Sequence, residues 1–80
     1  MAISYNNLWK LLIDKNMNKT DLRSRTKISS STMAKLTNQE MVALSVLEKI
    51  CAELECNIED VMQFVELEDV KKQMKEDDYV

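Results

Sequence analysis

The absence of both glycine and proline is the feature that most constrains how this 80-residue chain can fold. Tight β-turns need residues that tolerate a positive φ, and glycine supplies most of them. Helices have no such need, and the chain is rich in Leu, Met, Lys, Glu and Ala, which have high helix propensity. Because 45% of the residues are apolar, the chain can also bury a core. These features predict a single small all-α domain.

The spacing of apolar residues and the residues suited to capping predict five helices. They cover about residues 5–15, 19–26, 30–36, 44–54 and 58–65. Asn18, Ser29 and Asn57 are suitable N-caps for the second, third and fifth helices, while the first helix has two candidates, Ser4 and Asn6. We therefore expect a domain over residues 1–65. The charged tail, 66–80, keeps a narrow apolar stripe, which is consistent with an extra C-terminal helix.

Charge is distributed unevenly along the chain. The net charge is −3. Residues 10–36 hold seven basic and two acidic residues (+5), whereas residues 37–80 hold four basic and twelve acidic residues (−8). A protein polarised in this way can present one basic face to phosphate groups. Solvated helix faces that bind nothing give the same pattern, so charge alone leaves both interpretations open.

Several classes of protein lack support in the sequence. No run of about 18 apolar residues is present, and the polar start MAISYNNLWK is unlike a signal peptide, so we expect a cytoplasmic protein without a membrane span. The chain has no histidine, no Gly-rich loop and no base near either cysteine. We expect no enzyme activity, metal site, cofactor or small-molecule ligand. Cys51 and Cys56 are interpreted as reduced residues of the core or a helix end, about 140° apart if they share one helix.

Three stretches of the sequence resemble parts of a known family. The first, NKTDLRSRTKISSSTMAKL (residues 18–36), has apolar residues at Leu22, Ile28, Met33 and Leu36. With these at its inner positions, the stretch resembles the bihelical unit of the Cro and phage-repressor type of helix-turn-helix domain. VLEKICAELECNIEDVM (residues 46–62) is similar to its fourth helix and the start of its fifth. SYNNLWKLLIDKNM (residues 4–17) matches a common bacterial branch, the xenobiotic-response-element-like regulators. The resemblance covers about residues 3–65 and implies a five-helix lambda-repressor-like fold.

Two residues depart from the family pattern. Lys27 stands at the turn position where the family often has glycine, and a lysine at positive φ costs about 1 kcal/mol. Arg23 stands where a small alanine is common, so its guanidinium must turn to solvent. Both departures affect the angle of the third helix rather than the fold.

The resemblance implies that the third helix enters the major groove of double-stranded DNA. The residues it assigns to base contacts are Ser30, Ser31 and Lys35, and those assigned to bases or phosphates are Ser29 and Thr32. Only Lys35 has a clear preference, for guanine O6 and N7. Phosphate contacts fall to Asn18 and Lys19 on one side of the helix and to Lys27, Thr37 and Asn38 on the other.

Because the base contacts are few, one copy should bind DNA weakly, and we expect a homodimer on a palindromic site. We expect this dimer to act as a bacterial or phage-encoded repressor at the nucleoid. The alternative is a protein-interaction module that keeps the helix-turn-helix fold, which the acidic C-terminal part would favour. Trp9 also has two interpretations, as a core residue or as an exposed anchor for a partner.

Overall fold

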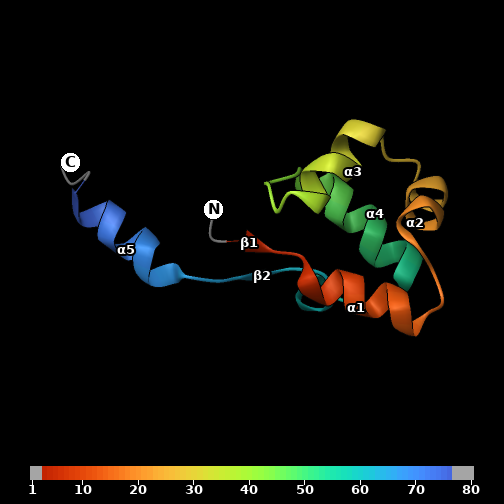
Figure 1. Ribbon diagram of the computed structural model, residues 1–80, viewed down its shortest axis with the longest axis horizontal. Coiled ribbons are helices and arrows are strands. Elements are labelled where there is room, and N and C mark those ends of the chain that lie inside the picture. Colours follow the sequence, from red (N-terminus) through yellow and green to blue (C-terminus); the bar gives the residue numbers. More distant parts are fainter. Residues whose placement is uncertain (1–2, 77–80) are drawn as a thin grey trace.

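The computed structural model describes residues 3–76, and this range contains five α-helices, one 3₁₀ turn and two short strands (Figure 1). The elements follow one another as β1 (Ile3–Ser4), α1 (Asn6–Asp14), α2 (Lys19–Thr26), α3 (Ser30–Thr37), α4 (Leu44–Leu54), η1 (Ile58–Asp60), β2 (Gln63–Phe64) and α5 (Leu67–Glu76). The first four helices begin and end within one or two residues of the predicted positions. The expected fold is confirmed in its class and in its number of helices.

Helices α1 to α4 surround a single core that the predicted apolar stripes supply. Its buried members are Leu8 and Leu12 of α1, Leu22 of α2, Met33 and Leu36 of α3, Leu47, Ile50 and Leu54 of α4, together with Ile3, Tyr5, Ile28 and Val61. Each stripe repeats at three or four residues, so one face of every helix turns inward. The core thereby fixes α2 and α3 against α4.

The segment predicted as the fifth helix, residues 58–65, is not an α-helix. Only η1 is helical, and its expected cap is present, since the Asp60 carboxylate accepts a hydrogen bond from Asn57 N–H at 3.1 Å. The chain then extends as β2, in which Phe64 pairs with Ile3 and Gln63 with Ser4 in antiparallel register. The prediction was wrong because residues 63–64 pair with residues 3–4 as strands, so their backbone hydrogen bonds are made with a distant segment. Local spacing cannot reveal such a partner.

The fifth helix of the structure is instead α5, in the tail segment. It leaves the four-helix core in the direction of β2, so the molecule measures 45 × 23 × 19 Å (Figure 1). The apolar stripe of α5 does not join the core: Leu67 is 54% exposed, Val70 37% and Met74 63%. No helix within residues 3–76 is both long and apolar enough to cross a bilayer.

The two cysteines pack against the core, as expected, but they do not share a helix. Helix α4 ends at Leu54, and Glu55 adopts a left-handed conformation with φ 53°. The chain therefore turns back, and Cys56 N–H donates to the Cys51 carbonyl at 3.0 Å. Burial, and to a smaller extent the neighbouring Cys51, raises the pKa of the Cys56 thiol to about 11. A partly buried thiol with a raised pKa is rarely ionised, so Cys56 should be unreactive.

Candidate nucleic-acid interface

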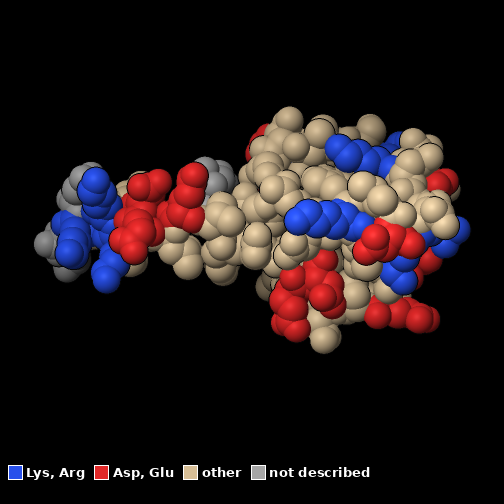
Figure 2. All heavy atoms as spheres, turned by 60° about the horizontal axis from the view of Figure 1, so that its bottom comes forward, with Lys and Arg blue, Asp and Glu red and all other residues tan. Residues whose placement is uncertain are grey.

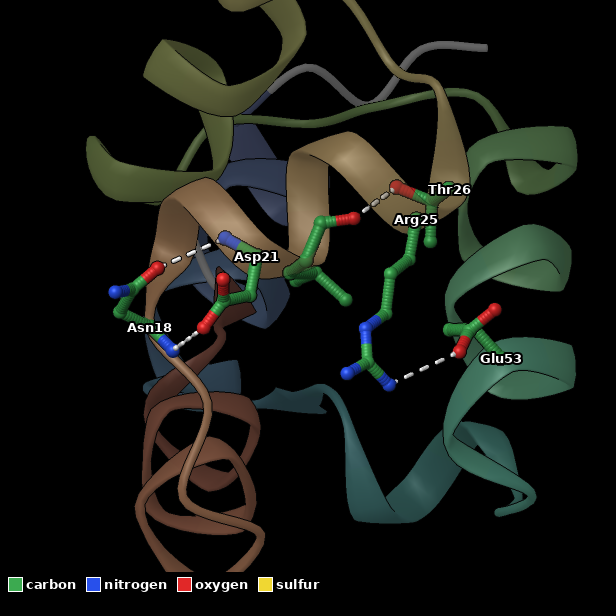
Figure 3. Close-up of polar contacts among 6 residues, drawn as sticks. Asn18, Asp21, Arg25, Thr26 and Glu53 are labelled. Atoms are coloured by element: carbon green, nitrogen blue, oxygen red, sulfur yellow. Dashed lines mark hydrogen bonds and ion pairs between the residues drawn. The ribbon is translucent and has the colours of Figure 1, made fainter.

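Helix α2 is defined by hydrogen bonds at both of its ends. At its start the Asn18 side chain accepts from Asp21 N–H at 2.8 Å, and the Asp21 carboxylate accepts from Asn18 N–H at 3.1 Å (Figure 3). This is the predicted capping box. At its end the buried Thr26 hydroxyl donates to the Leu22 carbonyl at 2.7 Å. Few apolar residues support this helix, so the box and this bond set its length.

The turn from α2 to α3 passes through Lys27 and Ile28. Lys27 has φ 58° and ψ 31°, which is the left-handed conformation expected at a position where the family often has glycine. Ile28 is only 7% exposed and inserts into the core, which anchors the turn. Arg23 is exposed, as its size required. Arg25 lies 3.6 Å from Glu53 of α4, a surface pair that adds little stability but orients the arginine away from the turn (Figure 3).

The first turn of α3 is organised by Ser29. Its hydroxyl oxygen accepts from Thr32 N–H at 3.1 Å, lies 3.0 Å from the Ser31 hydroxyl and donates to the Thr32 hydroxyl at 3.0 Å. Ser29 and Thr32 were expected to contact bases or phosphates, but their hydroxyl groups already form hydrogen bonds with each other in the helix cap. Ser30 and Lys35 are exposed, while Ser31 is exposed and bonded to the cap.

The phosphate candidates divide between the two ends of α3, with one change from the expected grouping. Lys19 Nζ donates to the Thr37 hydroxyl at 3.1 Å, which brings the start of α2 beside the end of α3. Thr37 thus lies on the side of Asn18 and Lys19, not on the side of Lys27. This neighbourhood differs from the expected grouping because the contact joins residues of two helices, which local spacing does not reveal.

Trp9 contributes to this end of the interface. Its ring is partly buried and packs against the core, in line with the core interpretation. The Lys19 ammonium lies 4.3 Å from the centre of the same ring. A cation over an aromatic face is held by the ring quadrupole. The ring and the Thr37 hydroxyl together fix a long side chain that would otherwise be mobile.

A set of hydrogen bonds that the sequence did not reveal fixes the loop after α3. The Gln39 side-chain carbonyl accepts from Tyr5 N–H at 2.7 Å, and the Tyr5 hydroxyl donates to the Glu40 carbonyl at 2.7 Å. Tyr5 is 1% exposed, and burial raises the pKa of its hydroxyl, so the hydroxyl remains a donor well above neutral pH. Since its partners lie 34 and 35 residues away, no local pattern could have identified this role.

Comparison with known proteins matches this arrangement to a family. The family profile for the Cro/C1-type HTH DNA-binding domain matches residues 7–66. The chain is also similar to a solved structure described as that of transcriptional regulator VanUg, with 47% sequence identity and a TM-score of 0.79 over 80% of this chain and 85% of that chain. No curated protein matches the sequence. This chain belongs to the Cro/C1-type helix-turn-helix DNA-binding family, a family of DNA-binding rather than catalytic domains.

Proposed function

We propose that this protein regulates transcription as a homodimer that binds a palindromic DNA site in the bacterial cytoplasm, with α3 of each copy in the major groove of one half-site. The observation that carries the proposal is the outer face of α3. Ser30, Ser31 and Lys35 are exposed there, while Met33 and Leu36 anchor the opposite face in the core. The face carries no acidic residue that would repel a phosphate backbone.

The roles of the flanking residues follow from their positions. Lys19, Thr37, Asn18 and Asn38 would contact phosphates at the C-terminal end of α3, and Lys27 would do so at its N-terminal end. Lysines at both ends of α3 would hold this helix in the major groove of DNA, since phosphate contacts set the register of such a domain on the duplex. Ser29 and Thr32 would act mainly by holding the first turn, because their hydroxyls bond one another.

The proposed direction of regulation follows from what DNA binding alone can do at an operator. A protein that occupies an operator excludes polymerase through binding alone, so we propose repression. The similarity to a protein described as a transcriptional regulator supports regulation in general.

The proposal is tested by selecting bound duplexes from a random pool and by measuring affinity with fluorescence anisotropy. We expect a palindrome whose half-sites contain guanine opposite Lys35. Lys35→Ala should weaken specific binding by about 10- to 100-fold and relax the preference at that guanine. Lys15→Ala is the matched control, since Lys15 is exposed at the end of α1 near Cys56, away from α3, and should change affinity by no more than about twofold.

Two results would contradict the proposal. Selection of single half-sites without symmetry would exclude the dimeric arrangement. Failure to bind any duplex at low salt would exclude DNA binding by this chain and would favour the protein-interaction alternative, in which the acidic residues 37–80 contact a basic partner.

A further inference from the structure

Helix α5 has an apolar face that no other part of residues 3–76 covers. Its three apolar side chains, Leu67, Val70 and Met74, fall at positions that share one face of the helix, and all are exposed. An isolated helix of ten residues is shorter than the roughly 12–15 residues that make a helix even marginally stable in water. A helix of this length therefore requires a surface on which to pack.

The domain carries an apolar groove of about 440 Å³ that the described residues also leave uncovered. Met41 and Leu44, before and at the start of α4, form one side, and Ile58 and Phe64 form the other. These four side chains are 61%, 71%, 43% and 61% exposed. Such a cluster of large apolar side chains on the surface of a small protein marks a contact site.

We propose that α5 of one copy docks in this groove of a second copy, so that two copies hold each other by exchanging their C-terminal helices. The proposal rests on the homodimer proposed above and specifies its interface. Phe64 ends β2 and lines the groove, while only two residues connect it to α5. From Phe64 to Leu67 this connection spans at most about 11 Å, which favours the groove of a neighbour over the groove that Phe64 itself lines.

Charge complementarity supports a second copy as the occupant. The free half of α5 carries Lys71, Lys72 and Lys75, and Figure 2 shows basic residues gathered at the outer end of this arm. Glu59 lines the groove, and Glu48 lines the hollow that adjoins it. An exchanged arm would therefore bring three lysines to an acidic rim. Each chain carries both the basic arm and the acidic groove rim, as a twofold symmetric interface requires.

The interface would leave the DNA-facing surface free. The groove is formed by β1, the end of the loop between α3 and α4, the start of α4, η1 and β2, whereas DNA would meet α3 and the start of α2. Two copies joined through their C-terminal arms could present both α3 helices to one duplex.

Sedimentation equilibrium of the full chain without DNA, over a dilution series, tests the proposal. We expect the unmodified chain to form a dimer. Val70→Asp combined with Met74→Asp disables the arm, and Leu44→Glu disables the groove while placing a favourable acid in the first turn of α4. Each variant should weaken the dimer by about 100-fold or more. Ile13→Glu is the control, because Ile13 is 72% exposed on α1 outside the groove, and its dimer should be unchanged.

Mixing the arm variant with the groove variant provides a second measurement. One intact arm then meets one intact groove, so the mixture should associate more strongly than either variant alone. A monomeric unmodified chain, as expected if α5 folds onto its own groove, would overturn the proposal. Dimers that survive both variants, or a mixture that gains no association, would overturn it as well. Circular dichroism of each variant establishes that it is folded.

The two proposals can fail separately. A palindromic DNA site recognised by a dimer that the arm and groove variants leave intact would disprove the helix exchange alone. A dimer that these variants disrupt, but that selects no palindrome, would disprove the DNA arrangement alone.

Discussion

Single residues show how a chain without glycine terminates its elements. Within residues 3–76, Asn16, Lys27, Gln39, Glu55 and Glu66 have a positive φ. Each follows a helix or precedes one, at positions where glycine would be free of steric strain. Only one of the five is an asparagine, the side chain that tolerates this conformation best after glycine. The chain thus forms its helix ends at some expense in stability.

Lys27 allows this strain to be measured. We expect Lys27→Gly to raise the free energy of unfolding by about 0.5–1 kcal/mol, because glycine relieves the left-handed strain and this gain exceeds its added freedom in the unfolded chain. Urea denaturation provides the measurement.

Lys27→Ala is the control for that substitution. Alanine removes the charge but keeps the Cβ atom, so it should not stabilise the protein. Both variants should lose DNA affinity equally if the lysine contacts phosphate. Equal stability of the glycine and alanine variants would show that the turn is unstrained.

At the scale of elements, α3 shows how a helix can be well formed and yet read DNA through few side chains. Ser29 supplies the cap, and Met33 with Leu36 supplies the buried face. These three residues determine where the helix lies. The side chains left for base contacts are small hydroxyls and Lys35, so affinity depends strongly on how the helix is held.

The cap can be separated from DNA binding by two substitutions at Ser29. Ser29→Ala should lower the free energy of unfolding by about 1 kcal/mol, because Thr32 N–H loses its acceptor. Ser29→Asp restores an acceptor and should keep the stability of the native protein. It should nevertheless weaken DNA binding more than Ser29→Ala does, since a carboxylate at this end of α3 repels phosphate.

Thermal melts and anisotropy measured on both Ser29 variants give the comparison. If the aspartate variant binds DNA as well as the native protein, the N-terminal end of α3 does not approach the backbone, and the proposed orientation is wrong.

At the scale of the whole molecule, most basic residues of 10–36 and most acidic residues of 37–76 lie on different elements. Five of the basic residues, Lys19, Arg23, Arg25, Lys27 and Lys35, lie on α2, α3 or the turn between them, whereas α4, η1 and the first turn of α5 carry acidic residues, and the two groups meet at the Arg25–Glu53 pair. A negative net charge is therefore compatible with DNA binding, because the local field at α3 is what a phosphate meets.

The salt dependence of binding tests this separation. Affinity should fall steeply with salt, and Lys19→Gln should lower the magnitude of the slope of log K against log salt by about 2, because the dimer loses one phosphate contact in each of its two copies. Lys15→Gln makes the same substitution at an exposed residue near Cys56, away from α3, and should leave the slope unchanged. A slope insensitive to Lys19 would place this end of α2 away from DNA.

The sequence determined the four helices of the core, the caps at Asn18 and Ser29, and the left-handed turn at Lys27. The helices and the caps depend on residues within one or two helical turns of each other, so local spacing is sufficient to identify them, whereas the turn at Lys27 was expected from the resemblance to the family. The composition also excluded the folds that depend on glycine turns.

Only the tertiary structure decided the rest, because the contacts involved join distant parts of the chain. Residues 63–64 became a strand through pairing with residues 3–4, and the loop after α3 is held by Tyr5. Lys19 of α2 and Thr37 of α3 meet across the two helices. The sequence could place an apolar stripe in the tail, but the structure showed that residues 3–76 leave both this stripe and a groove of the domain uncovered, which is the basis for the proposed dimer.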